Sequence, residues 1–423
     1  TVSIAPNAAL FSSGQTLPQS GWAFGTGTNS VTFGKSGNTA NITTGADLSV
    51  GGPVNFIGNT ILLSNNITAT GAGNMISAKA AAYIEVASNK TIRSNGGKVV
   101  LWSSSAGTQG NVRLLSASTL CTVPTASNCS ATVAGVTGGG DIVIGGGSTA
   151  DAGDADLPAG YASAYNGPGN DKDSNGVSIG TANTNGAGAN LYSGGGNITV
   201  RGQSGTATGG YYSAGVVVVS GSNINAEGGK ITLDANNQLT SGTNTAGAME
   251  INAWTGSTTI SSSNTASDSI LFKTSGTNYG NSFWIGNTGT TIKNTNGGGF
   301  KVQATKITDG LTAVFNVTGP IVFEPLTTDF AADTTFGSGI TFSPNNPNYL
   351  RFGSTTTTVR VTNSGNRTVA GDYVQYGGVV VNNNAVQTTG TGVIMLSSKK
   401  SIDSYGTLTS ATGAISLIAD NDG

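Results

Sequence analysis

Apolar and polar residues alternate with period two along most of the chain, in short runs separated by Gly, Asn and Ser. This alternation is typical of β-strands with one buried face. No segment carries the i, i+3, i+4, i+7 spacing of an amphipathic helix, and the frequent glycines disfavour long helices. The pattern therefore predicts an all-β chain built from many short strands.

Three segments repeat the same pattern, at 83–94, 215–226 and 393–404. Each has apolar residues two apart, then a Ser, then an Ile, and then a small residue two positions further on. A Gly-Gly pair and another strand follow the first two copies without a gap. After the third copy the next strand, which contains Ile415, arrives six residues late, and we interpret the delay as a local insertion.

The Gly-Gly strand unit also occurs alone, at 139–144, 195–200 and 297–302. Several intervals between core positions are near twenty residues. Phe300 to Ile321 is 21 residues and Ile321 to Ile340 is 19, whereas the interval from Ile142 to Ile198 is much longer and implies a loop insertion. A unit of this size cannot bury its own apolar face, so successive units must stack.

The predicted fold class is therefore an all-β, parallel (right-handed) β-helix or solenoid with loop insertions. One continuous solenoid segment spans 1–423, with a Cys-containing insertion at 118–137 and a Gly- and Asp-rich insertion at 150–176. About twenty coils at about 4.8 Å each predict a rod on the order of 100 Å. An antiparallel sandwich with Gly-rich turns is the alternative. The side chains expected inside are Ile84, Val86, Ile92, Val99 and Leu101.

Composition narrows the classes of partner. Charged residues are 9% of the chain and the net charge is -2, so the chain lacks the clustered Lys and Arg of a nucleic-acid-binding protein. No apolar run approaches the roughly 18 residues of a membrane helix. We expect no nucleic-acid partner and no membrane span. The 66 glycines accompany 36% hydrophobic residues, which favours a thin core over disorder.

The two cysteines, Cys121 and Cys129, flank a short loop. The even number of cysteines and the short loop favour a disulfide between them. Two reduced thiols are the alternative.

One local motif resembles the first half of a calcium loop. Asp171, Asp173 and Asn175 place oxygen ligands at alternate positions, and Gly176 follows for the tight turn. The Glu that would complete the loop is absent, since Ala182 occupies its position. A solvated loop whose Asp and Asn side chains cap turns is the alternative. No other cofactor is indicated.

Catalytic signals are weak. The chain has no histidine, which removes the commonest general base and most zinc sites. Glycoside hydrolysis needs only two carboxylates, but no Glu lies in a run with other acids and aromatics. We therefore expect no enzymatic activity and assign no catalytic residue. Trp102 alternates outward from Leu101 and could stack a sugar, or it could simply cover the strand.

The Gly-Gly strand units resemble repeats of filamentous-haemagglutinin-like exoproteins of Gram-negative bacteria. The stretches that carry the resemblance are 96–103, 195–202, 228–235 and 414–423. It implies a right-handed β-helix, exported to the cell surface or medium, that acts as an adhesin, a biofilm component or a filament. The usual N-terminal secretion region of that family is not recognisable here.

We therefore expect a structural or adhesive segment of an extracellular fibre or matrix at the bacterial cell surface. The expected partners are neighbouring copies or flanking solenoid of the same protein, and a host or matrix glycan. A glycan-binding or carbohydrate-active β-helix is the alternative function. The alternating residues at 2–4 and 415–418 give neither end the look of a polar cap, so we expect further coils or neighbouring subunits to stack there.

Overall fold

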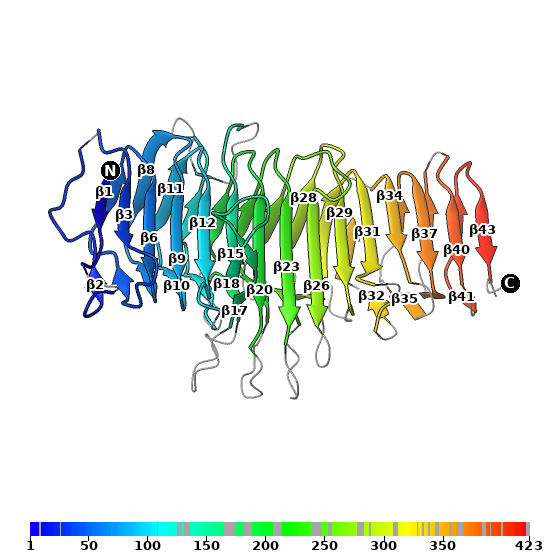
Figure 1. Cartoon of the computed structure of the whole chain (residues 1–423). Helices are drawn as coiled ribbons and strands as arrows, with labels where there is room; N and C mark the ends of the chain where they lie inside the picture. Colours follow the sequence, from blue (N-terminus) through cyan, green and yellow to red (C-terminus); the bar gives the residue numbers. More distant parts are fainter. Residues whose placement is uncertain are drawn as a thin grey trace.

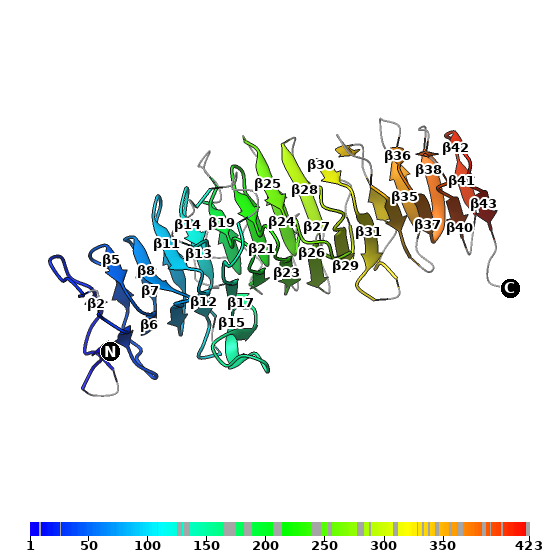
Figure 2. The same ribbon diagram turned by 90° about the horizontal axis from the view of Figure 1, so that it is seen from above.

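The computed structural model describes the whole chain except for short segments. The segments left out are 8–9, 26, 108, 125–128, 131–135, 165–174, 182–187, 206–213, 239–246, 253–255, 277–282, 287–288, 308–311, 328, 332–333, 337–338, 343–346, 355–357, 363–366, 383–385, 390, 399–400 and 420–423. The described residues form an elongated stack of coils with the chain running from one end to the other (Figures 1 and 2). They contain no helix that is long and apolar enough to cross a membrane.

One long sheet, here called sheet A, runs the full length of the stack. All but two of its 17 strands stack one per coil. These fifteen are β1 (Val2–Ile4), β3 (Val31–Gly34), β6 (Val54–Gly58), β9 (Ile76–Ala80), β12 (Val99–Ser103), β15 (Ile142–Ala150), β20 (Ile198–Gln203), β23 (Ile231–Asn237), β26 (Ile270–Gly276), β29 (Phe300–Ala304), β31 (Pro320–Pro325), β34 (Tyr349–Phe352), β37 (Asp372–Tyr376), β40 (Ile394–Ser397) and β43 (Ile415–Ile418).

Two further sheets complete each coil. Sheet B contains β2 (Gln15–Thr16), β4 (Ile42–Thr43), β7 (Ile61–Leu63), β10 (Ile84–Val86), β13 (Val112–Leu114), β18 (Val177–Ile179), β21 (Val216–Val219), β24 (Met249–Asn252) and β27 (Phe283–Gly286). Sheet C contains β5 (Leu48–Val50), β8 (Ile67–Ala72), β11 (Thr91–Asn95), β14 (Thr119–Cys121), β19 (Asn190–Tyr192), β22 (Asn223–Asn225), β25 (Thr258–Ser261), β28 (Thr290–Asn294), β30 (Thr312–Val317) and β33 (Gly339–Phe342).

In the last coils two shorter sheets follow sheet A in chain order. Sheet D contains β32 (Thr334–Phe336), β35 (Thr358–Thr362), β38 (Gly378–Asn382) and β41 (Ile402–Ser404). Sheet E contains β36 (Arg367–Val369), β39 (Val386–Thr388) and β42 (Leu408–Ser410). The coil-to-coil pairings in all five sheets are parallel; among the described strands the one antiparallel pair joins β15 to β16 (Pro158–Gly160). The fold is therefore a parallel β-helix, and the antiparallel sandwich is excluded.

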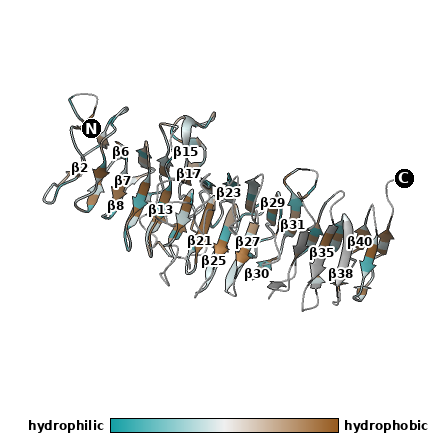
Figure 3. Ribbon diagram, turned by 90° about the horizontal axis from the view of Figure 1, so that it is seen from below, coloured by the Kyte–Doolittle hydropathy of each residue, from teal (hydrophilic) through white to brown (hydrophobic). Residues whose placement is uncertain are grey.

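The apolar column predicted from the alternation lies inside. Ile84, Val86, Ile92, Val99 and Leu101 are all completely buried, as predicted. Hydrophobic positions, coloured brown, lie beside hydrophilic positions, coloured teal, along the strands (Figure 3). Towards the C-terminal half phenylalanines fill the column, and Phe323 and Phe352 stack with ring centroids 5.2 Å apart. Each coil therefore depends on its neighbours for burial of its apolar residues.

The Gly-Gly strand units all lie on sheet A in a single register. Val99 pairs with Ile142, Ile142 with Ile198, and Ile198 with Ile231, so the 56-residue interval between Ile142 and Ile198 is one coil with long insertions. Phe300 pairs with Ile321 as expected from their spacing. Ile321, however, pairs with Leu350, while Ile340 lies in sheet C. The 19-residue interval from Ile321 to Ile340 therefore joins two different faces.

The third copy of the repeat lies on a different face from the first two. Ile84 and Val216, each the second residue of its copy, lie in sheet B, whereas the equivalent Ile394 lies in sheet A and pairs with Ile415. The six-residue delay before Ile415 contains a complete strand, β42, rather than an irregular insertion. The alternation of apolar residues is the same on every face, so it could not distinguish them.

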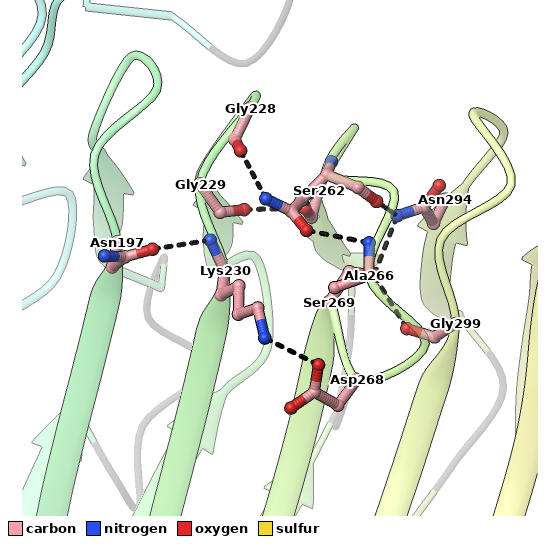
Figure 4. Close-up of polar contacts among 11 residues, drawn as sticks. Asn197, Gly228, Gly229, Lys230, Ser262, Ala266, Asp268, Ser269, Asn294 and Gly299 are labelled. Atoms are coloured by element: carbon pink, nitrogen blue, oxygen red, sulfur yellow. Dashed lines mark hydrogen bonds and ion pairs between the residues drawn. The ribbon is translucent and has the colours of Figure 1, made fainter.

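The turns that lead into sheet A are held by buried polar side chains (Figure 4). Ser262 donates its hydroxyl to the Gly229 carbonyl at 2.7 Å, and Ser269 donates to the Gly299 carbonyl at 2.7 Å. The Asn294 amide donates to the Ser269 hydroxyl at 2.8 Å. Each of these bonds joins residues of two neighbouring coils, so each also fixes one coil on the next.

The second glycine of each Gly-Gly pair is required by the closeness of the neighbouring coil. A Cβ atom on Gly229 would lie 1.9 Å from the Gly196 carbonyl oxygen, and one on Gly196 would lie 2.1 Å from the Gly140 carbonyl oxygen. Neither residue has a positive φ. Backbone approach, and not a left-handed turn, therefore explains glycine at these positions.

The two ends of the described stack differ. Val2, Ile4, Phe11 and Phe24 pack, partly buried, against the first coils, and Phe24 meets Phe33 edge-on with ring centroids 6.3 Å apart. On the last strand, β43, the large apolar side chains are exposed, Ile415 at 45%, Leu417 at 56% and Ile418 at 40%.

The stacked column makes a clear prediction for Ile231→Asp, which places a charge in the core. We expect it to lower the free energy of unfolding by on the order of 3–5 kcal/mol, because a buried carboxylate there has no partner. Urea denaturation followed by circular dichroism measures the change. Thr232→Asp is the matched control, since the adjacent side chain points outward, and its effect should stay within about 1 kcal/mol. Equal effects of the two variants would contradict the assigned faces.

Candidate functional site

A hairpin insertion covers part of the outer face of sheet A. It leaves the coil along the extended β15, returns through β16, and rejoins sheet A by β17 (Ala162–Ser163), which pairs with β20. The insertion stands out from the rod between β12 and β20 (Figure 2). It falls largely within the predicted insertion at 150–176, and the chain already departs from the coil before residue 150.

Polar contacts fasten the hairpin to coils on both sides. The Trp102 indole N–H donates to the Gly147 carbonyl at 2.7 Å, and Lys98 pairs with Asp154. On the other side the Arg201 guanidinium donates to the Pro158 carbonyl at 3.0 Å. The hairpin is therefore held over at least two coils and not only at its base.

Tyr161 and Asp234 form a further contact between the hairpin and the coils. The Tyr161 hydroxyl donates to Asp234 Oδ1 at 3.1 Å, and Lys273 Nζ lies 4.0 Å from Asp234 Oδ2. Burial raises the pKa of Asp234, and burial together with the Asp234 charge raises the pKa of Tyr161 to about 12. A phenol that stays protonated is a hydrogen-bond donor and a poor general base. This pair is suited to anchoring the hairpin.

Trp102 does point outward from sheet A, but it is not open to solvent. Its side chain is only 3% exposed, and the Lys79 ammonium lies 3.7 Å from the ring centroid. A ring in this position cannot present a free face to a sugar. Of the two interpretations of Trp102, the structure supports a side chain that covers the strand.

A shallow groove of about 470 Å³ lies beside the hairpin. Its floor is the outer face of β6, β9 and β12, and Ala155 and Asp156 of the hairpin form one wall. The other lining residues are Pro53, Asn55, Ile57, Met75, Ser77, Ala78, Lys79, Val100 and Trp102. The groove is therefore an aliphatic surface bordered by an amide, a hydroxyl and two opposite charges.

The predicted calcium ligands are only partly described. Asp171 and Asp173 lie outside the described residues. Asn175 is completely buried, and its side-chain oxygen accepts a hydrogen bond from the Ala214 N–H at 2.9 Å. Upstream, Asp151 and Asp154 accept bonds from the backbone N–H groups of Gly153 and Asp156, which is the turn-capping role of the alternative. Calcium binding stays a prediction.

The two cysteines are joined in a disulfide, with the sulfurs 1.97 Å apart. Cys121 ends β14, so the chain leaves the coil after this residue rather than at 118. Cys121, Val123 and Tyr192 form a small apolar cluster against which Cys129 and Val136 pack. The bridge thus holds the insertion against sheet C; its presence in the protein in solution stays a prediction.

Glu250 is a buried acid that the sequence did not single out. It lies on β24 between Met249 and Ile251, which both point into the core, and its neighbours in register are Val217 and Trp284. The residue is 7% exposed, and burial raises its pKa to about 7. Alternation predicts its outward direction, but only the three-dimensional packing accounts for its burial.

The acidic side chains of the described residues do not gather into a metal site. Within the described ranges, no three His, Cys, Asp or Glu side chains are placed to hold one metal ion. Glu85 and Glu250 lie on sheet B, Glu324 on sheet A, and Glu227 at a turn.

No family model, curated protein or solved structure matches the chain.

The raised pKa of Glu250 predicts a pH-dependent stability. Because the folded-state pKa of about 7 exceeds the ordinary value of 4.5, the contribution is complete below about pH 4.5 and is lost as the pH rises through 7. Relative to Glu250→Gln, the protein should lose up to about 3 kcal/mol of unfolding free energy over this range. Urea denaturation at pH 4.5 and pH 8 measures it.

Glu85→Gln is the control for this prediction. Glu85 lies on the same outer face of sheet B, and its carboxylate is 3.2 Å from Arg113. This variant should keep the loss of stability between pH 4.5 and pH 8. If Glu250→Gln keeps the full loss as well, Glu250 is not its source.

Proposed function

We propose that the chain is a structural and adhesive segment of a secreted bacterial cell-surface exoprotein of the filamentous-haemagglutinin-like class, and that it forms part of an extracellular fibre or matrix. The observation that carries the proposal is the uninterrupted register of sheet A, in which fifteen strands stack one per coil. At about 4.8 Å per coil the stack is about 70 Å long. Such a rod can extend far from the cell surface. Loops on its outside leave the apolar column intact.

The arrangement of the insertions supports this proposal. The Cys-containing loop packs on the outside of sheet C and the hairpin packs on the outside of sheet A, while the apolar column runs past both. A solenoid can therefore vary its surface without changing its spacing, which suits a fibre that displays binding loops.

The partner proposed for the rod is another coil of the same kind. The β43 strand pairs with β40, and the exposed Ile415 and Leu417 continue the inward row of sheet A. A coil from flanking solenoid or from a neighbouring copy would cover these side chains and pair with the strand edge. Adhesion would then depend on groups on the sides of the rod.

A second candidate is a glycan-binding or carbohydrate-active β-helix. The groove beside the hairpin is the observation that favours binding. The Tyr161–Asp234 pair argues against catalysis, since its phenol stays protonated and its carboxylate is committed to an anchor. We propose that the chain is not an enzyme.

Location tests the leading proposal. An antibody raised against the purified chain should label the outer surface of intact source cells, and extended fibres near them, in immunogold electron microscopy. Antibody absorbed with the purified chain is the control for specificity, and an antibody against a cytoplasmic protein checks that the cells are intact. Labelling confined to the interior of sectioned cells would contradict the proposal.

A further inference from the structure

The groove beside the hairpin has the chemistry of a carbohydrate-binding surface. Its floor belongs to three successive coils, β6, β9 and β12. Outward-pointing residues at the same place on these strands are Asn55, Ser77 and Val100, which pair in register with one another. Val100 is only 1% exposed, so a linear ligand that lies along the rod axis would meet Asn55 and Ser77. These two residues are about 4.8 Å apart, a step comparable to one unit of an extended sugar chain.

Two of these residues form a polar row that has hydrogen-bonding capacity to spare. The Ser77 hydroxyl donates to Asn55 Oδ1 at 2.7 Å, and Asn55 Nδ2 donates to the Thr32 hydroxyl at 3.4 Å. The amide has a second N–H, and the serine oxygen still has lone pairs that can accept. Both side chains are half-buried, so these groups are held in place by their neighbours and are still reachable.

The rest of the floor is aliphatic. Ile57 and Met75 are half-buried and line it, whereas Val100 is almost completely buried and the Lys79 side chain lies over Trp102. A sugar ring has hydroxyls at its edge and C–H groups on its faces, so it matches a polar row beside an apolar strip. The two charges that line the groove, Lys79 and Asp156, are opposite in sign, which favours a neutral ligand over an acidic or basic one.

An extended peptide is the other ligand of similar shape. Peptides that bind to sheets usually add a strand at a free edge. Here β6 pairs with β3 and β9, and β12 pairs with β9 and β15, so the floor offers no free edge. A peptide would leave much of its backbone without partners in the groove.

We propose that this groove binds a neutral, linear oligosaccharide that runs along the rod axis. The Asn55–Ser77 row bonds to its hydroxyls, and the half-buried side chains of Ile57 and Met75 pack against its rings. The volume of about 470 Å³ is within the usual range of small-ligand sites and has room for a short oligosaccharide. The inference concerns this site alone and does not depend on where the protein is located.

Isothermal titration calorimetry of the full chain with cellopentaose, maltopentaose and N-acetylchitopentaose tests the proposal. We expect at least one of these neutral probes to bind with a Kd below about 10 mM. The double variant Asn55→Ala, Ser77→Ala should weaken that binding at least tenfold, the effect of losing one to two hydrogen bonds. Thermal unfolding should confirm that the variant is folded.

The matched control is Thr199→Ala, Thr232→Ala. These residues also point outward from sheet A, on β20 and β23, and they lie outside the groove. This variant should bind as the parent chain does. A lack of binding of all three probes up to about 10 mM would overturn the proposal, and so would binding that survives the Asn55, Ser77 variant.

Two further probes distinguish the kind of ligand. A trigalacturonate that binds more tightly than the neutral sugars would overturn the assignment of a neutral ligand. Binding of a capped, uncharged decapeptide that is lost in the double variant, without sugar binding, would show a peptide site instead. Each of these outcomes leaves the immunogold test of cell-surface location unaffected.

Discussion

The close approach of backbone to backbone at the turns into sheet A is the constraint on which the rest of the structure depends. Gly196 and Gly229 have no room for a Cβ atom, because the carbonyl oxygen of the previous coil lies where it would be. The same turns are fixed by buried hydroxyls such as that of Ser262. With this spacing set, every strand of sheet A meets its neighbour in register, and the apolar column can close without gaps.

The alternation of the sequence predicted the strands and the direction of their side chains, because that pattern is a local property of each strand. It did not predict which face a strand belongs to, so the segment that contains Ile394 was grouped with two segments of sheet B although Ile394 lies in sheet A. The Gly-Gly pair was the better marker, since the Gly-Gly strand units identified in the sequence all lie at the turns into sheet A. The number of coils was overestimated because loop residues were counted as coil residues.

The candidate site depends on contacts between segments far apart in the chain. Trp102 could be predicted to point outward, but its cover comes from Lys79 and from a hairpin more than forty residues later. Nothing local to Tyr161 or Asp234 indicates that they meet. The burial of Glu250 could not be predicted from the sequence either, because it depends on neighbours from other coils. The insertion could be predicted from an irregular interval, but not the surface on which it packs.

The central claim is that successive Gly-Gly strand units stack as neighbouring coils in one register, and engineered disulfides test it most directly. Thr199 and Thr232 are partners on adjacent strands, whereas Leu271 is one coil further on. Adjacent coils are about 4.8 Å apart, and a disulfide cannot span Cα atoms more than about 7 Å apart. Under mild oxidation, Thr199→Cys with Thr232→Cys should cross-link efficiently and Thr199→Cys with Leu271→Cys should not. Cross-linking of the second pair in preference to the first would contradict the stacking described here.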